Sequence, residues 1–129
     1  MCFVKKLKNP LTASEDIEVY KVFRKVVSYF NKPEYYTGPY KMDFIYENVN
    51  GEYTCNDFGK EIESGCVGFH SFKNFNDAVR LMDNCNMWAL DHESYEIIPC
   101  IIPKGTEYYE GYFFNGQETY VSKKIQLNY

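Results

Sequence analysis

The chain has 129 residues, which is enough for one hydrophobic core but not for two, so we expect a single domain over residues 1–129. Hydrophobic residues make up 45%, and this proportion excludes an intrinsically disordered chain. The formal net charge of −4 argues against non-specific binding to duplex nucleic acid, although a small anionic ligand needs only a local group of donors.

The five cysteines are scattered and form no CxxC pair, which favours reduced, mostly buried thiols over a disulfide scaffold. With only two histidines and no cluster of Cys and His, we expect neither a metal site nor a cofactor. The N-terminal segment lacks the apolar stretch of a signal peptide, and no window of the sequence is apolar enough for a membrane span. These features together predict a cytoplasmic protein that does not associate with membranes.

Aromatic residues account for 19% of the chain, with thirteen Tyr, ten Phe and one Trp. An excess of Tyr means that many rings carry a hydroxyl group that needs water or a partner. Two interpretations stay open: ordinary sheet residues with aromatic rims, or a surface that stacks on something flat.

In chain order, residues 1–14 are predicted to form an N-terminal arm. The segment IEVYKVFRKV (17–26) contains two alternating sets of side chains, one of them Ile17, Val19, Lys21 and Phe23, and predicts a strand. The segment NKPEYYTGPY (31–40) has the punctuation of a loop, and its tyrosines 35, 36 and 40 make it a candidate ligand rim or partner surface. Two short strands are expected on either side of a hairpin turn at residues 50–51.

The segment GCVGFHSF (65–72) predicts one further strand, and the helix that follows, at about 74–87, has Asn74 as its cap. Its apolar face comprises Phe75, Ala78, Val79, Met82 and Cys85. The segment SYEIIPCIIP predicts a central strand with Pro99 at a bulge or edge, then a turn at residues 104–105 and a final strand from about 118 to 127. The fold class is therefore α+β, a mostly antiparallel twisted sheet with one principal helix packed on it.

His70 stands at the end of a predicted strand, just before a helix N-terminus, where backbone N–H groups favour anions. Gly68 lies on the same face of that strand and would leave room for a ligand beside His70 and Ser71. The structural alternative is a histidine bonded to a neighbouring backbone group, and the two interpretations are evenly balanced.

A second cluster lies in IIPKGTEYYEG and ETYVSKK. Stacking of a base on tyrosine, with lysine or serine at a phosphate, is a common way to hold nucleotide-sized ligands. The alternative is that the tyrosines are cross-strand pairs and that the lysines protect an exposed edge. The candidate ligand-binding residues of the whole chain are His70, Ser71, Tyr36, Tyr108, Tyr109, Tyr120, Ser122 and Lys123.

Motifs of the main catalytic classes, such as G-x-S-x-G, a glycine-rich phosphate loop or H-E-x-x-H, are not found in the sequence. Pairs of nearby carboxylates occur at 61 and 63 and at 107 and 110, but with 18 acidic residues such pairs are expected on solvated faces. The sequence therefore favours a binding protein over an enzyme.

The pattern VYKVF, GFHSF, CIIPKGTEYYEG and YVSKKIQL, over residues 17–127, resembles a group of small phage and gut-bacterial domains of unknown function. The order of elements is also similar to the ADP-ribosyltransferase fold. That resemblance places Tyr20 or Lys21 at the family's first position, His70 and Ser71 at its second, and Glu118 at its third. It implies that, in an enzyme, His70 and Glu118 would be the catalytic residues.

Small phage proteins of this size include sponges that sequester the cyclic-nucleotide signals of bacterial anti-phage defence. We therefore expect a non-enzymatic protein of phage type that binds a small nucleotide-like ligand in the host cytoplasm, with a deep site most easily made in a homo-oligomer. One alternative is an ADP-ribosyltransferase-like enzyme or a degenerate relative of one. The other is a small interaction module that binds a host defence component through the tyrosine-rich segment 33–40.

Overall fold

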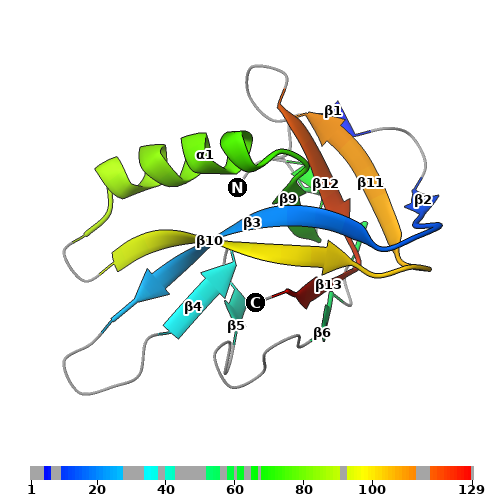
Figure 1. Cartoon of the computed structure of the whole chain (residues 1–129), viewed down its shortest axis with the longest axis horizontal. Helices are drawn as coiled ribbons and strands as arrows, with labels where there is room; N and C mark the ends of the chain where they lie inside the picture. The colour runs from blue at the N-terminus through cyan, green and yellow to red at the C-terminus, as the bar shows by residue number, and fades with distance from the viewer. Residues whose placement is uncertain are drawn as a thin grey trace.

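A computed structural model describes most of the chain, and Figure 1 shows the arrangement of its elements. The described residues are 5–6, 10–27, 34–37, 40–42, 52–55, 58–59, 61–62, 65–66, 68–90, 93–112 and 117–128.

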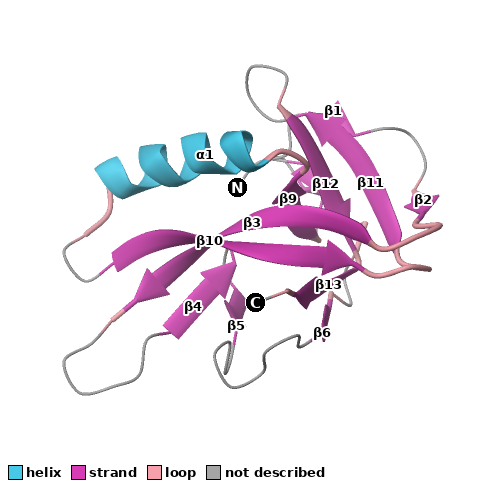
Figure 2. Cartoon of the chain, in the orientation of Figure 1, coloured by secondary structure: helices cyan, strands magenta, loops and turns pink. Residues whose placement is uncertain are grey.

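One antiparallel sheet dominates the described part of the chain, as the magenta arrows of Figure 2 show. Its main path runs in the order β1-β11-β12-β9-β3-β10-β13-β6, with β2 beside β11 and the pair β4 and β5 beside β3. A separate two-stranded sheet contains β7 and β8. The strands are β1 (Lys5–Lys6), β2 (Leu11–Thr12), β3 (Ile17–Val26), β4 (Glu34–Thr37), β5 (Tyr40–Met42), β6 (Glu52–Thr54), β7 (Glu61–Ile62), β8 (Gly65–Cys66), β9 (Phe69–Phe72), β10 (Glu93–Ile102), β11 (Glu107–Tyr112), β12 (Glu118–Ser122) and β13 (Lys124–Leu127).

A bend at Lys123 makes the sheet curl back on itself. β12 and β13 are separated only by this residue, yet β12 pairs with β9 and β11 whereas β13 pairs with β10 and β6. At the bend, the Lys123 N–H donates to the Glu107 carbonyl (3.0 Å) and the Lys123 carbonyl accepts from Cys55 N–H (2.8 Å). Strand pairing leads from β12 through β9, β3 and β10 to β13. The chain itself joins β13 to β12 through Lys123, so the two ends of this series of strands are connected.

The longest strands, β3 and β10, pair along their whole length, from Ile17 opposite Ile102 to Val26 opposite Glu93. Pro99 therefore lies within a continuous ladder, opposite Tyr20, and not at a bulge. The carbonyl of Pro99 accepts from Asn128 N–H (2.9 Å), so the side of Pro99 that has no N–H faces the end of β13. A proline is tolerated here because the pairing with β13 starts only at Cys100.

The core occupies one face of the sheet, which we call the core face. The alternation of β3 and β10 and their register put Val19 beside Cys100 and Lys21 beside Ile98. The buried apolar residues of this face pack together inside the curl of the sheet. They are Val19, Phe23, Phe69, Ile98, Cys100, Ile102, Ile125 and Leu127, with Ala13 from the segment before β3.

The opposite face of β3 and β10 carries the helix α1 (Phe75–Met87). Ala78 is fully buried against the sheet, while Phe75 is 51% exposed and touches Tyr20 edge-on with ring centroids 5.4 Å apart. Phe75 therefore contacts the sheet through Tyr20 of β3, as its place on the apolar face of the helix predicts, but its side chain stays half-exposed. Asn74 occupies the cap position but makes no capping bond, and its amide instead donates to Asp77 Oδ2 (3.4 Å).

Asn86 ties the last turn of α1 to the edge of β10. Its Oδ1 accepts from Tyr95 N–H (2.8 Å) and its Nδ2 donates to the Tyr95 carbonyl (3.3 Å). The N–H and carbonyl of Tyr95 lie outside the part of β10 that pairs with β13. The side-chain amide of Asn86 therefore makes the hydrogen bonds that a neighbouring strand would otherwise make.

We expect Asn86→Ala to lower the free energy of unfolding by about 1–2 kcal/mol, because two backbone groups lose their partner. Urea denaturation measures this change. Asn84→Ala, which truncates an exposed asparagine of the same helix, serves as the control and should leave stability nearly unchanged. Equal effects of the two substitutions would contradict the role of Asn86.

Several sequence predictions need correction. Residues 34–37 and 40–42 are strands, not a loop, because β4 pairs with the end of β3. The segment 65–72 is not one strand, since Gly65–Cys66 belongs to the small second sheet and only Phe69–Phe72 joins the main one. Parts of the N-terminal arm are short strands paired with β11. The predicted turn at 50–51 lies outside the described residues.

The α+β class, the strand at 17–26, the helix and the turn at 104–105 are confirmed. Gly105 makes this turn with φ of 87°, a conformation that favours glycine. Within the described ranges, no helix has the length and apolar character needed to cross a membrane.

Candidate functional site

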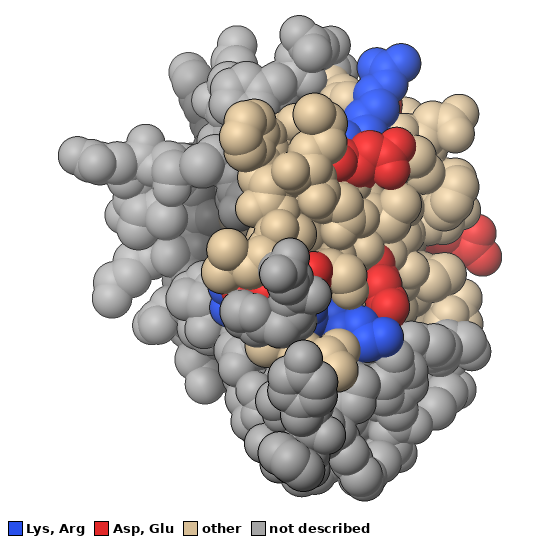
Figure 3. All heavy atoms as spheres, turned by 90° about the vertical axis from the view of Figure 1, so that its left-hand side faces the viewer, with Lys and Arg blue, Asp and Glu red and all other residues tan. Residues whose placement is uncertain are grey.

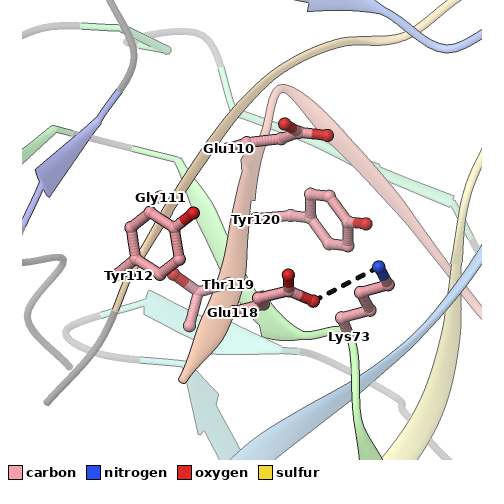
Figure 4. Close-up of a pocket in the computed structure, with 7 residues that line it drawn as sticks. All are labelled: Lys73, Glu110, Gly111, Tyr112, Glu118, Thr119 and Tyr120. Carbon is pink, nitrogen blue, oxygen red and sulfur yellow. Dashed lines mark ion pairs between the residues drawn. The ribbon is translucent and has the colours of Figure 1, made fainter. Parts of the chain in front are cut away.

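A hollow of about 160 Å³ lies where β12 begins and β9 ends. Figure 4 shows Glu110, Tyr120 and Glu118 on the same side of β12, with Lys73 reaching towards Glu118. The register explains this grouping, because Glu110 on β11 lies opposite Tyr120, and Tyr120 and Glu118 are two residues apart on one strand. Gly111, Tyr112 and Thr119 complete the lining.

Among the described residues that line this hollow, Lys73 is the one lysine. It directly follows β9, and its N–H donates to the Glu118 carbonyl (3.3 Å), which carries the strand pairing one residue further. The ammonium then meets Glu118 Oε2 at 3.2 Å. The hydrogen bond to Glu118, helped by the charge of the same carboxylate, raises the pKa of Lys73 above its ordinary value. Lys73 is therefore a fixed cation at neutral pH, suited to hold an acceptor and not to act as a base.

Tyr120 separates the hollow from the core. Its ring packs edge-on against Tyr108, with centroids 5.6 Å apart, and both rings contact the buried core residues. Burial raises the pKa of the Tyr120 phenol, so this hydroxyl stays protonated and available as a donor at neutral pH. The described lining of the hollow thus includes the ring of Tyr120, which Tyr108 holds in place, together with the ammonium of Lys73 and two carboxylates.

Deeper on the core face lies a buried lysine, Lys21, which is only 2% exposed. Its Nζ donates to the His70 carbonyl (2.6 Å) and lies 5.7 Å from the centroid of the Phe23 ring and 6.0 Å from that of Phe69. Burial lowers the pKa of Lys21 from 10.5 to about 8, an effect that the nearby Cys100 thiol partly opposes. Burial also raises the pKa of Cys100 from 9.0 to about 12, which makes this thiol unreactive.

The candidate residues from the sequence fall into separate places. Ser71 and Ser122 lie on the core face and are fully buried. The side chain of His70 belongs to the other face, that of Val121, while its carbonyl bonds to Lys21. Because Glu118 shares the face of Tyr120, the side chains of His70 and Glu118 lie on opposite faces of the sheet and do not form a pair.

The tyrosines of the candidate cluster also divide between the two faces. Tyr108 and Tyr120 contact each other, whereas Tyr109 packs on Phe58 with centroids 5.4 Å apart. Lys123 forms the bend between β12 and β13, and Tyr36 lies on β4 opposite Arg24 of β3. Of the candidate ligand-binding residues whose side chains the structure describes, only Tyr120 lines the hollow, where it is joined by Glu118.

Gly68 does not open a cleft. A Cβ atom at this position would lie 2.5 Å from Val121 Cγ1, 3.1 Å from the Ser122 carbonyl oxygen and 3.2 Å from Phe58 Cδ2. The space beside His70 is therefore already filled, and glycine is required by the close approach of β12.

Lys73 and Glu110 line the hollow but were not among the sequence candidates. The sequence predicts a solvated carboxylate at Glu110, and Lys73 lies between the predicted strand and the predicted helix. Lys73 directly follows β9, and β9 pairs with β12, which carries Glu118. This pairing would have identified Lys73 as a site residue, but it is not visible in the sequence. In the described part of the chain, no group of three or more His, Cys, Asp and Glu could hold a metal ion.

The end of the molecule at the left of Figure 1 carries charges of both signs side by side, as Figure 3 shows for the described residues. Arg24 pairs with Glu93 (3.8 Å) and Lys25 with Glu96 (3.0 Å) where β3 and β10 meet. Three large apolar side chains after or at the end of α1 are mostly exposed: Met87, Trp88 and Leu90.

No family model, curated protein or solved structure matches this chain.

Proposed function

We propose that this protein binds a small nucleotide-like ligand, without converting it, in the hollow beside Tyr120. The observation that supports this function is the grouping of the Tyr120 ring with Lys73, Glu110 and Glu118 around one space. An aromatic ring gives a stacking surface for a base, and the two carboxylates accept hydrogen bonds from amino or hydroxyl groups. The ammonium of Lys73 supplies a donor to a carbonyl or phosphate oxygen.

The charges of the hollow favour one part of such a ligand. Among the described residues that line the hollow, two carboxylates stand against one ammonium, and this balance favours a base or a ribose over a phosphate group. The volume of about 160 Å³ is below the roughly 300–1,000 Å³ of pockets that enclose a whole ligand. The base or ribose would therefore occupy the hollow, and the remaining groups would stay at the surface or contact a second copy of the chain.

Binding without turnover is favoured by two features. The side chains of His70 and Glu118, which the transferase resemblance would make catalytic, lie on opposite faces of the sheet. Lys73 is kept protonated by Glu118, so it is not available as a nucleophile. Sequestration of a cyclic-nucleotide signal of anti-phage defence is the biological role that we propose for such a binder.

Thermal melting with cyclic di- and trinucleotides, cyclic ADP-ribose forms and NAD tests the proposal, and calorimetry then measures affinity. We expect Tyr120→Leu to weaken binding about 5- to 150-fold, the effect of losing one stacked base. Lys73→Met should also weaken binding, because a donor is lost. Tyr109→Leu is the matched control, since this ring packs on Phe58 on the other face.

The ligand should be recovered intact after heat denaturation. Release of nicotinamide from NAD that is lost in Glu118→Gln would replace this proposal with the transferase. If no nucleotide shifts the melting temperature, the binding proposal fails and an interaction module with a host protein becomes the better explanation.

A further inference from the structure

Three polar side chains are buried on the core face, inward from the hollow. Lys21 is 2% exposed, and Ser71 and Ser122 are fully buried. They come from three neighbouring strands, β3, β9 and β12, and none of them lines the hollow. They therefore form a polar group of their own inside the curl of the sheet.

The register places both serines on the β9 side of Lys21, with Ser71 on the neighbouring strand and Ser122 one strand further away. Tyr20 lies opposite Phe72, so the next pair along these antiparallel strands brings Lys21 opposite Ser71. The ammonium extends from there to the His70 carbonyl and to within 6.0 Å of the centroid of the Phe69 ring. Phe69 in turn lies opposite Ser122 on β12. The end of the lysine side chain thus lies between the row of Ser71 and the row of Ser122.

The hydrogen bonds of this group are incomplete. An ammonium has three donors, and among the described residues Lys21 uses one, to the His70 carbonyl. The hydroxyl groups of Ser71 and Ser122 are buried and have no hydrogen-bond partner in the part of the chain that the structure describes. Each such group, left unsatisfied, costs about 1–3 kcal/mol, and a buried charge without a counter-ion costs more. Neither hydroxyl accepts from Lys21, so the two remaining N–H donors of the ammonium need an acceptor, and each hydroxyl can donate to the same one.

The charge of the group identifies the kind of acceptor. With its pKa at about 8, Lys21 is mostly protonated at pH 7, and no carboxylate of the described residues pairs with it. A water molecule would accept hydrogen bonds but would leave the charge uncompensated. A small monovalent anion accepts from the ammonium and both hydroxyls and neutralises the charge as well.

We infer that Lys21, Ser71 and Ser122 bind one halide-sized inorganic anion, such as chloride, inside the curl of the sheet. This site is independent of the proposed ligand hollow. The anion stabilises the folded protein, because the site exists only when β3, β9 and β12 are paired.

Thermal melting in sodium chloride and sodium bromide, each exchanged against sodium gluconate at constant ionic strength and pH 7, tests this inference. Gluconate is too large for the site and keeps the sodium concentration and charge screening equal. We expect the melting temperature to rise by about 3–5 °C for each tenfold increase of halide above the dissociation constant. Lys21→Met should abolish this dependence, and Ser71→Ala and Ser122→Ala should each weaken it.

Two controls locate the effect. Ser14→Ala truncates an exposed serine, and Lys73→Met removes the lysine of the hollow; both should keep the full halide dependence. A wild-type protein that melts at the same temperature in halide and gluconate would overturn the inference and indicate water in the site. A halide effect that survives Lys21→Met, or that disappears in Lys73→Met, would also overturn it.

A second measurement does not depend on the stability of any variant. Crystals of the wild type soaked in sodium bromide should show an anomalous peak within hydrogen-bond distance of Lys21 Nζ. Bromide peaks confined to the molecular surface would contradict the site.

Discussion

In chloride-free buffer, Lys21 should raise the free energy of unfolding by about 1 kcal/mol between pH 8 and pH 9. The folded protein loses the proton of Lys21 at about pH 8, whereas the unfolded chain keeps it up to pH 10.5. Between these values the unfolded state binds more protons, so increasing pH favours the folded state. The cost of burying the charge of Lys21 disappears as its amine loses the proton.

Cys100 acts in the opposite direction at higher pH. The unfolded thiol ionises at about pH 9 and the folded thiol only at about pH 12, so the folded state binds more protons in that window and loses stability. The profile should therefore level off above pH 9 and fall above pH 10.5. The raised pKa values of Tyr95, Tyr108 and Tyr120 add to this fall, since buried phenols ionise late.

Two variants separate the contributions, with urea denaturation at each pH as the measurement. Lys21→Met should remove the rise and increase stability at pH 7 by about 2 kcal/mol, because the cost of about 3 kcal/mol for the buried charge exceeds the lost hydrogen bond of about 1 kcal/mol. Cys100→Ala should extend the rise to pH 10.5. A wild-type profile that is flat between pH 8 and pH 9 would show that Lys21 is not a buried cation.

Gly68→Ala should destabilise the protein by about 2–3 kcal/mol. The new methyl group would meet Val121 Cγ1 at 2.5 Å, and the Ser122 carbonyl at 3.1 Å belongs to the backbone of a paired strand and has little freedom to move. The cost is steric, since the backbone of Gly68 is not in the left-handed region.

A double-mutant cycle with Val121→Ala tests this cause. In the Val121→Ala background, the alanine at position 68 should cost roughly half as much or less, because the closest atom is gone. Gly105→Ala is the contrasting control: nothing lies within 4 Å of its Cβ, and only the φ of 87° opposes the substitution, at about 1–2 kcal/mol in either background. An equal cost of Gly68→Ala in both backgrounds would exclude the contact with Val121.

The fold was predictable wherever local pattern and tertiary environment agree. The alternation of residues 17–26 and the helical spacing of 75–87 reflect faces that are in fact buried, so both elements were predicted within a residue. Residues 34–37 carry loop signals but are a strand, because the end of β3 offers a free edge that the sequence does not reveal. Likewise, a bend within residues 118–127 depends on two different partners of one segment.

The candidate site was less predictable because it depends on strand pairing. Tyr120 was identified from its neighbours in the sequence, but Lys73 and Glu110 join it only through the pairing of β12 with β9 and β11. Lys21 gave a local signal: it alternates with Val19 and Phe23, which predicts a lysine on a buried face. Its partner, the His70 carbonyl, lies 49 positions away and is a backbone group, which no side-chain motif identifies.

The pairing of β3 with β10 also has a consequence for how the protein folds. The paired residues are separated by 67 positions at Val26 and Glu93 and by 85 positions at Ile17 and Ile102. Every contact of this central ladder requires closure of a long loop, so topology of this kind slows folding into the range of milliseconds to seconds. Until β10 has been synthesised, β3 has no central partner and presents apolar residues such as Val19 and Phe23 to the surroundings. The segment between them thus sets the time during which the nascent chain is most exposed to aggregation.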